Sequence, residues 1–261
     1  MPISAIWADL RQRLRRMRPP QIIVLAFLTI ILLGSALLCL PAASKSGRPT
    51  DFLTSLFTAT SATCVTGLIR VDTGTYWSSF GQAVILVMIQ IGGLGFMTIA
   101  SIFFFTLRRK IGLRQRLVLA QALSFDQISG VVGLVILMLR FWPEFGFGRA
   151  LWYGVFHSIS AYCNAGFDVL GDLASGGSLC GYVDAPVVNL TIMALITIGG
   201  LGFAVWGDIR KKRRFSRMNV YTRLVLSISC GLIVGGAAAV ALLEWNNPGT
   251  IGGLTAGGKV L

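Results

Sequence analysis

Long stretches without a charged side chain are the feature that most limits how this chain can fold. Crossing the roughly 30 Å of bilayer hydrocarbon takes about 20 apolar residues in a helix. Four stretches meet that length: 22–40, 77–107, 185–207 and 224–243. The chain has 54% hydrophobic and 13% charged residues, too much apolar surface for a water-soluble core. The sequence therefore predicts an all-α integral membrane protein.

The positive charges are grouped between these stretches. Sixteen of the 23 Lys and Arg fall in three clusters, at 11–18, 108–116 and 210–217. Basic loops of membrane proteins are retained on the cytoplasmic side. This layout predicts a multi-pass protein of the cell inner (plasma) membrane with a cytoplasmic N-terminus, and it excludes a nucleic-acid-binding face despite the net charge of +13. The clusters either contact anionic lipid or a partner protein, or serve orientation alone.

A fifth uncharged stretch, residues 127–139, has 13 residues, about 20 Å as a helix. That is short for a crossing. If it crosses, however, all three basic clusters lie on the inner side, whereas otherwise the third cluster would lie outside. We therefore interpret it as a shortened span, with bilayer thinning or flanking residues making up the deficit.

Two parts of the sequence repeat. The hexapeptide IGGLGF occurs at residues 91–96 and again at 198–203. Upstream, FTATSATCVTG at 57–67 aligns with FHSISAYCNAG at 156–166, and Phe, Ser, Ala, Cys and Gly coincide at an offset of 99. Each repeat predicts an outward span, a short Ser/Thr-bearing segment ending in Cys-x-x-Gly, and an inward span. Two crossings per unit make the repeats parallel around an axis along the membrane normal.

The central loops of the two repeats, residues 51–71 and 149–172, are too short to cross and are expected to enter and leave by the outer face. Non-helical backbone at membrane depth is tolerated where it is buried in protein or lines a water-filled path. Its carbonyls can replace the hydration shell of a cation, and a glycine supplies the backbone angles that direct them inward. The sequence thus predicts re-entrant loops that line a pore, with Gly67 and Gly166 as more than turn glycines.

Five motifs occur in order along the chain: FTATSATCVTGL at 57–68, DTGTY at 72–76, QIGGLGF at 90–96, RKIGL at 109–113 and CNAGF at 163–167. With these motifs the sequence resembles the Trk/Ktr family of potassium uptake proteins, most closely the Ktr-type membrane subunit. The resemblance covers most of the chain from Pro19 onward.

The resemblance implies a channel-like subunit of four M1, pore helix, M2 repeats that takes up potassium through one filter strand per repeat. It implies that potassium contacts the backbone of Val65, Thr66 and Gly67 in the first strand, and of Asn164, Ala165 and Gly166 in the second. Sodium is the candidate coupling ion. The implied partners are the lipid bilayer, a cytosolic nucleotide-binding regulatory subunit and a second copy in a homodimer.

On this basis the chain divides into four parts: a basic cytoplasmic N-terminus (1–20), repeat 1 (21–116), repeat 2 with a shortened M1 (117–217) and the start of repeat 3 (218–261). That is two complete M1–pore helix–M2 repeats and part of a third, with two of four expected filter strands. A non-conducting fragment or assembly subunit is therefore the alternative function. A polytopic membrane enzyme is less favoured, because no Ser/His/Asp, Cys/His or HExxH arrangement occurs.

Two features have competing interpretations. The IGGLGF copies do not fit a phosphate-binding GxGxxG and lie inside apolar stretches, so close helix packing by small residues is favoured. His157, the single histidine, could be grouped with Cys163 and Cys180 as a metal site. The spacing fits no zinc pattern, and a packing or hydrogen-bonding role is favoured.

Overall fold

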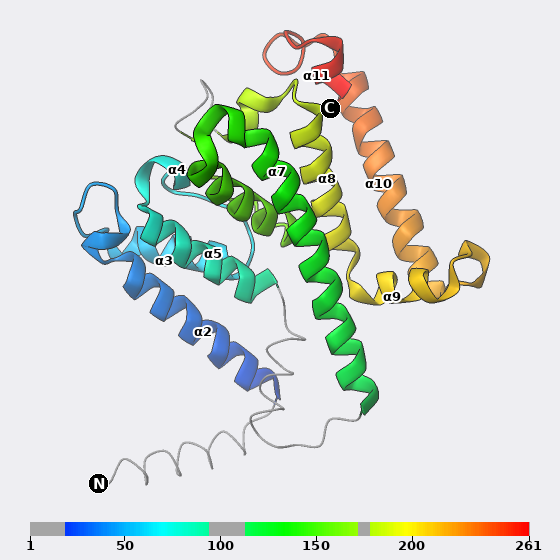
Figure 1. The fold of residues 1–261 in the computed structure, drawn as a ribbon, viewed down its shortest axis with the longest axis horizontal. Helices are drawn as coiled ribbons and strands as arrows, with labels where there is room; N and C mark the ends of the chain where they lie inside the picture. The colour runs from blue at the N-terminus through cyan, green and yellow to red at the C-terminus, as the bar shows by residue number, and fades with distance from the viewer. Residues whose placement is uncertain (1–18, 94–112, 172–177, 261) are drawn as a thin grey trace. The chain divides into compact units, whose positions relative to one another are not determined.

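A computed structural model of the chain describes residues 19–93, 113–171 and 178–260. These residues form helices joined by turns and loops, and no strand occurs among them (Figure 1). The chain divides into two compact units: Met1–Asp72 with Tyr76–Arg116, and Thr73–Thr75 with Leu117–Leu261. The short helix α4 (Thr73–Tyr76) lies at the division. The predicted all-α class is confirmed for the described residues.

The first unit packs α2 (Pro19–Leu38), α3 (Phe52–Thr63) and α5 (Ser79–Gly93) against one another. A short 3-10 turn, η1 (Pro41–Ala43), follows α2. The Ser78 amide donates to the Ala43 carbonyl at 2.9 Å, which joins this turn to the start of α5. The apolar stretches 22–40 and 77–107 thus begin as helices here. Residues 94–107 of the second stretch lie outside the described residues.

The second unit opens with α7 (Leu113–Tyr162), which doubles back on itself (Figure 1). The reversal is at Gly146, whose φ of 74° and ψ of 165° are not helical. Only glycine adopts such angles readily, because it has no Cβ. The two arms are tied by a hydrogen bond of 2.6 Å from Ser158 Oγ to the Gly130 carbonyl. At Gly154, a Cβ would lie 3.0 Å from the Leu134 carbonyl oxygen, so the arms approach closely.

The first arm of α7 is longer than the 13 uncharged residues that predicted it. It runs 33 residues, from Leu113 to the residue before Gly146, which is about 50 Å of helix. The length is therefore ample for a crossing. That this arm crosses a membrane, and that repeat 2 has a shortened M1, remain predictions.

Three further helices complete the second unit. After η2 (Ser178–Tyr182), α8 (Pro186–Leu201) is followed by α9 (Phe203–Lys212), and α10 (Val220–Glu244) returns beside α8. Short segments η3 (Phe215–Arg217) and α11 (Ala256–Val260) lie before and after α10. The core of the unit is formed by buried apolar residues of α7, the loop after it, η2 and α8: Leu137, Phe141, Ala150, Leu170, Tyr182 and Val188.

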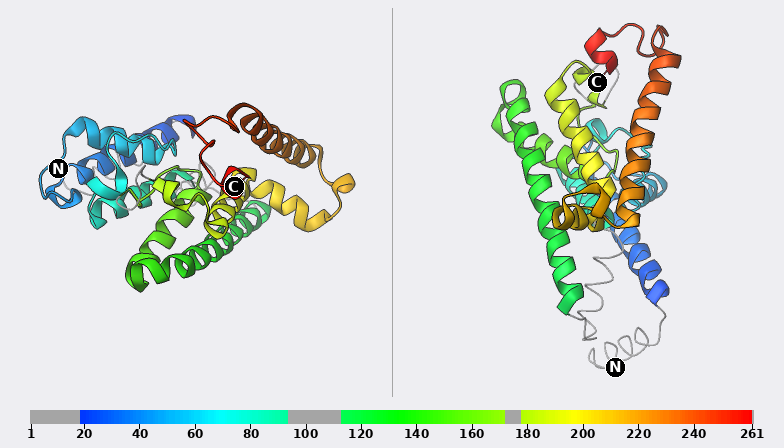
Figure 2. Two further views of the ribbon diagram at one scale, coloured as in Figure 1. Left: turned by 90° about the horizontal axis from the view of Figure 1, so that it is seen from above. Right: turned by 90° about the vertical axis from the view of Figure 1, so that its right-hand side faces the viewer.

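The stretch 185–207, predicted as one span, is not one straight helix. The helices on its two sides are bent by 94° at Gly202, and α9 lies across the ends of α8 and α10 (Figure 2). Gly202 has a φ of 75° and a ψ of 155°, which ends α8. Hydropathy could not reveal the bend, because the apolar run continues through it.

Among the described residues, two helical segments are long and apolar enough to cross a membrane: Ile128–Tyr162 and Val220–Glu244. The bent α8 and α9 pair would be a third, and Val24–Leu38 and Ser79–Gly93 are shorter apolar helices. Because α7 reverses at Gly146, its two arms cannot together form one crossing. These apolar helices support an all-α membrane protein.

Candidate functional site

The first candidate loop follows α3. Asp51 caps the start of this helix: its carboxylate accepts the Thr54 amide N–H at 2.9 Å and satisfies a donor that the first turn leaves unpaired. Hydrogen bonds from Thr54 lower the pKa of the Asp51 carboxyl, and the Arg70 guanidinium, 3.7 Å away, acts in the same direction. The N-terminal end of α3 is thus fixed by its cap.

The C-terminal end of α3 turns sharply at Val65. The Val65 amide donates to the Ala62 carbonyl at 3.3 Å, and the Thr66 amide donates to the Ser61 carbonyl at 2.9 Å. This pair of bonds is the Schellman arrangement, which needs a left-handed residue directly after the helix cap. Val65 takes that position with a φ of 55°, and Gly67 follows with a φ of 74°. A β-branched residue at positive φ is a true conformational outlier.

The second candidate loop follows the second arm of α7 and has the same backbone pattern. The Asn164 amide donates to the Ala161 carbonyl at 3.0 Å, and the Ala165 amide donates to the Ser160 carbonyl at 2.7 Å. Asn164 has a φ of 58° and Gly166 a φ of 71°. Both hydrogen bonds and both positive φ values therefore recur at the offset of 99 that relates the two sequence segments.

The glycines of the IGGLGF motif lie against the ends of these helices. A Cβ on Gly92 in α5 would overlap the carbonyl oxygen of Thr63, the last residue of α3. A Cβ on Gly199 in α8 would overlap the carbonyl oxygen of Tyr162, the last residue of α7. Close helix packing is confirmed at these two glycines. The remainder of the first copy, residues 94–96, lies outside the described residues.

The left-handed residues contact the same glycines. The Val65 Cγ2 lies 3.1 Å from the position that a Cβ on Gly92 would occupy. Asn164 places its side-chain amide beside Gly199, where Nδ2 donates to the Ile196 carbonyl of α8 at 3.3 Å. Each left-handed residue is thus held by the helix that follows its loop.

A serine near the C-terminal end of α3 and another near the end of α7 also hold the loops. Thr66 Oγ1 donates to Ser61 Oγ at 3.0 Å in the first unit. In the second, Ser160 Oγ donates to the Phe167 carbonyl at 2.5 Å. The alignment of the repeats matches Ser61 with Ser160, but no role was predicted for either. Their coincidence in the repeat was the signal that could have found them.

The six residues predicted for the filter therefore fall into two loops of matched backbone geometry, one in each unit: Val65, Thr66, Gly67, Asn164, Ala165 and Gly166. None of these six residues has a charged side chain. Each loop directly follows a helix C-terminus, the negative end of the helix dipole. Such a loop can offer a cation backbone carbonyls and a favourable helix field.

His157 lies in the second arm of α7 and is buried. Its Nδ1 lies 2.7 Å from the Tyr153 carbonyl oxygen, and its ring packs near Phe141 and Phe156. The predicted packing and hydrogen-bonding role is confirmed. Among the residues that the structure describes, no group of three or more His, Cys, Asp or Glu could hold a metal ion.

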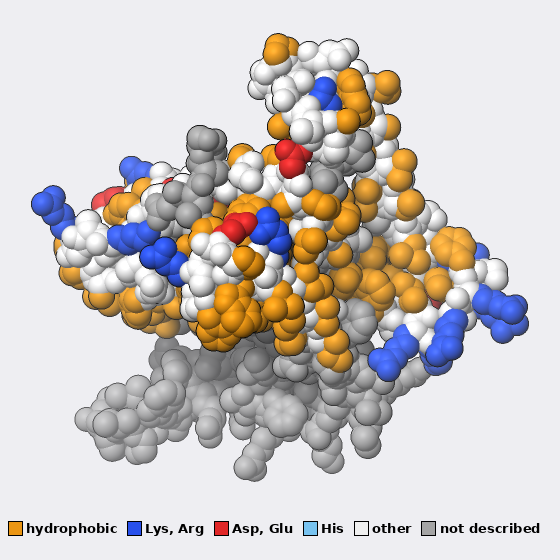
Figure 3. Space-filling view, turned by 45° about the horizontal axis from the view of Figure 1, so that its top comes forward, with side chains coloured by type: hydrophobic (Ala, Val, Ile, Leu, Met, Phe, Trp, Pro, Cys, Tyr) orange, Lys and Arg blue, Asp and Glu red, His pale blue; other side chains and the backbone are white. Residues whose placement is uncertain are grey.

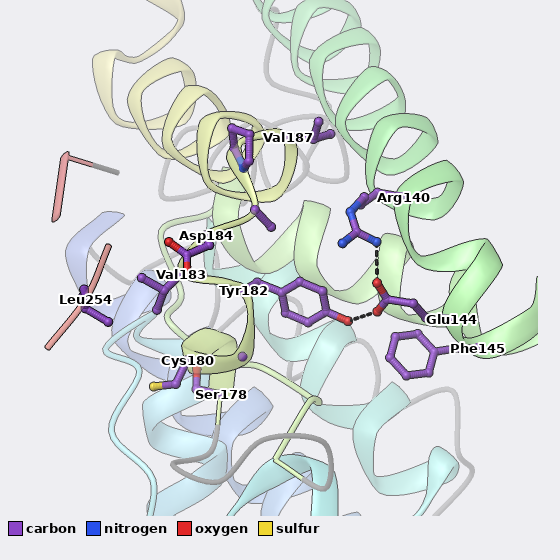
Figure 4. A pocket seen from close by; sticks show the side chains of 13 residues that line it. Arg140, Glu144, Phe145, Ser178, Cys180, Tyr182, Val183, Asp184, Val187 and Leu254 are labelled. Carbon is purple, nitrogen blue, oxygen red and sulfur yellow. Dashed lines mark hydrogen bonds and ion pairs between the residues drawn. The ribbon is translucent and has the colours of Figure 1, made fainter. Parts of the chain in front are cut away.

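The second unit also has a pocket of about 630 Å³ between α7, η2, the start of α8 and Leu254 (Figure 4). Glu144 is one of its lining residues; its carboxylate lies 2.5 Å from Arg140 Nη1 and accepts a hydrogen bond of 2.5 Å from the Tyr182 hydroxyl. Burial and this bond to Glu144 raise the pKa of the Tyr182 phenol. Arg140, Glu144 and Tyr182 therefore satisfy one another, and the residues of the two loops do not line the pocket.

Apolar helices and two matched loops at helix C-termini place the chain among α-helical membrane proteins. The family model described as TrkH, cation transport protein, matches residues 5–229. The chain belongs to this family.

The chain is also similar to curated relatives. It is 42% identical over 255 residues to Ktr system potassium uptake protein B of Bacillus subtilis, which covers 92% of this chain and 56% of the relative. It is 40% identical over 254 residues to the potassium/sodium uptake protein NtpJ of Enterococcus hirae, covering 91% and 55%. With Ktr system potassium uptake protein B of Vibrio alginolyticus the identity is 36% over 260 residues, covering 93% and 56%.

The chain thus spans a little over half the length of these relatives. The resemblance to the Trk/Ktr family is confirmed. The family and the relatives are cation transport proteins and not enzymes, as the sequence predicted.

Proposed function

We propose that this chain contributes two strands of a potassium-selective filter to a Trk/Ktr-type uptake system. The filter backbone comprises Val65, Thr66 and Gly67 in one strand and Asn164, Ala165 and Gly166 in the other. One observation carries the proposal: a left-handed residue, a residue outside the left-handed region and a left-handed glycine follow α3 in one unit and α7 in the other. A positive-φ glycine allows backbone angles that could direct carbonyls toward an ion, where they would replace its hydration shell.

Both loops offer an ion the same kind of ligand, the neutral backbone carbonyl. Residues 65–67 and 164–166 have no charged side chain, so an ion beside them would be held by carbonyl dipoles and by the negative ends of α3 and α7. These are hard, neutral oxygen ligands, suited to an alkali cation that must also leave. The names of the relatives, potassium uptake and potassium/sodium uptake, favour potassium as the transported ion and sodium as the coupling ion.

The topology and partners belong to the same proposal. Each unit supplies an outward span, a re-entrant pore helix and an inward span, with the N-terminus and basic loops in the cytoplasm of a multi-pass inner-membrane protein. The relatives are named as components of a Ktr system, which supports further subunits. We assign these roles to a cytosolic nucleotide-binding regulator and a second copy in a homodimer.

The chain matches a little over half of the relatives named for potassium uptake. A non-conducting fragment or assembly subunit that carries two filter strands is the alternative function.

The test is growth of a potassium-uptake-deficient bacterium at limiting potassium, together with uptake of rubidium as a potassium tracer. Two proteins are compared: the 261-residue chain, and a chimaera in which it replaces the matching part of the Bacillus subtilis relative. Gly67→Ser and Gly166→Ser are introduced into both. We expect tracer uptake by the chimaera to fall about tenfold or more with either substitution, because a side chain at positive φ costs on the order of 1–3 kcal/mol.

Gly47→Ser is the matched control. Gly47 also has a positive φ, 68°, but it lies in the loop between η1 and α3, and nothing is within 4 Å of its Cβ position. Uptake that survives both loop substitutions, or is lost equally with Gly47→Ser, would contradict the filter assignment. Uptake by the chimaera but not by the 261-residue chain would favour the assembly subunit.

A further inference from the structure

The segment from Gly202 to Tyr221, here the α9–α10 elbow, joins two apolar helices through a sharp turn. The helices on either side of Gly202 are bent by 94°. Trp206 bridges the bend, because its indole Nε1 donates to the Ile198 carbonyl of α8 at 3.0 Å. A left-handed Arg213, with a φ of 53°, then ends α9. The elbow is thus a formed structure joined to the end of α8.

A buried carboxylate fixes the two sides of the elbow together. Asp208 Oδ2 accepts the Asn219 amide N–H at 2.7 Å, and Asp208 Oδ1 lies 3.0 Å from Lys212 Nζ. Lys212 Nζ also donates to Asn219 Oδ1 at 2.6 Å. The side chain of Asp208 is only 7% exposed. One lysine and one aspartate therefore neutralise each other inside the elbow.

The other basic side chains of the elbow face solvent. They are Arg210, Lys211, Arg213, Arg214 and Arg217. Figure 3 shows Lys and Arg side chains gathered at the end of α9 and in the turn after it, beside a broad apolar surface. Asp208 is the one carboxylate in the elbow sequence, and Lys212 already pairs with it. The elbow therefore presents five exposed positive charges and no exposed negative one.

Apolar side chains are exposed among these charges. Phe215 is 52% exposed, and Val220 and Tyr221 are 64% and 62% exposed where α10 begins. Cations next to aromatic and aliphatic residues at the end of an apolar helix are typical of the membrane–water interface. A soluble acidic partner would match the charges but would leave these apolar residues unexplained.

We propose that the α9–α10 elbow binds the phosphate headgroups of anionic phospholipids. The five cations contact headgroup phosphates, while Phe215 and Tyr221 enter the region between headgroups and acyl chains. The Asp208–Lys212–Asn219 cluster holds the cations on one side of the turn. Each Lys or Arg near an anionic membrane surface strengthens association by on the order of fivefold.

The test measures lipid binding to the purified 261-residue chain in a neutral detergent by native mass spectrometry. Phosphatidylglycerol is compared with phosphatidylcholine of identical acyl chains. We expect phosphatidylglycerol to bind more tightly, and this preference to fall tenfold or more in Arg210→Gln/Arg214→Gln/Arg217→Gln. The corresponding triple Lys variant keeps the charges and is expected to retain the preference. Circular dichroism and gel filtration establish that the variants are folded.

The matched control removes three exposed cations elsewhere, as Lys45→Gln/Arg48→Gln/Arg149→Gln. This variant is expected to keep the preference for phosphatidylglycerol. The proposal is overturned if the control loses as much binding as the elbow variant, or if the two lipids bind equally to the unmodified chain. It is also overturned if hexaglutamate binds the elbow and phosphatidylglycerol does not displace it, since that outcome identifies an acidic protein partner.

Discussion

The loop after α3 and the loop after α7 share their backbone but not the residue that takes the left-handed position. Val65 occupies it in the first unit and Asn164 in the second. Asparagine tolerates this conformation, because its short polar side chain can bond locally, whereas valine does not. In both units the helix end supplies the same hydrogen bonds, and a glycine of the following helix receives the side chain. The backbone is therefore specified by its surroundings more than by the residue at the turn.

The largest effect is expected at the glycines that make this arrangement possible. Gly92→Ala and Gly199→Ala each place a Cβ against the carbonyl oxygen of the last residue of α3 or of α7, and should destabilise the protein by about 3 kcal/mol. Thermal unfolding in detergent measures the loss. Gly200→Ala is the control, because its Cβ would lie 3.7 Å from Asn164 Nδ2, an ordinary contact. If only one of the two alanine substitutions lowers the stability, the two units do not share this contact.

An intermediate effect is expected from exchanging the two left-handed residues. Asn164→Val should destabilise by about 1–2 kcal/mol, since it introduces the left-handed penalty and removes the hydrogen bond to Ile196. Val65→Asn should be neutral or stabilising by up to about 1 kcal/mol, since it removes that penalty. Unfolding midpoints of the two single variants and the double exchange test this. Destabilisation by Val65→Asn as large as that by Asn164→Val would show that packing of valine on Gly92 outweighs backbone preference.

The smallest effect on stability is expected at the N-terminal ends of α3 and of the second arm of α7, which differ between the units. α3 has a charged cap at Asp51, whereas the second arm of α7 follows Gly146. Asp51→Ala should lower the unfolding temperature slightly, because an unpaired amide replaces the cap bond. The pKa of Asp51 is lowered in the folded state, so its contribution is present above its ordinary pKa of 3.8 and is lost as the pH falls below it. A difference between wild type and variant that persists unchanged at pH 3 would contradict this.

Parts of the site could be read from the sequence, because they depend on local chemistry. The Cys-x-x-Gly repeat located both loops, and the expectation that Gly67 and Gly166 supply special backbone angles agrees with their φ values of 74° and 71°. The positive φ of Val65 could not be predicted, since valine rarely adopts that conformation. Its conformation depends on contact with Gly92, 27 residues away in the sequence.

Two features of the fold could not be predicted from hydropathy, for a different reason. The apolar run at 127–139 stops at Arg140, but the helix continues, because arginine is a good helix former and Arg140 pairs with Glu144 one turn later. A charged residue ends an apolar run without ending the helix. Conversely, the run at 185–207 continues through Gly202, where the backbone turns without any change in polarity. Hydropathy measures the side chains, and both of these boundaries depend on pairing or on backbone angles.

The reversal of α7 at a single glycine has a consequence for the order of assembly. Its two arms are in contact across a sequence separation of 28 residues, from Gly130 to Ser158, so little chain entropy is lost in bringing them together. Short closures of this kind form quickly. We expect this helical hairpin to close as soon as both arms have left the ribosome, before α8 has emerged. Each loop would then be completed only when the helix that follows it, α5 or α8, packs against its left-handed residue.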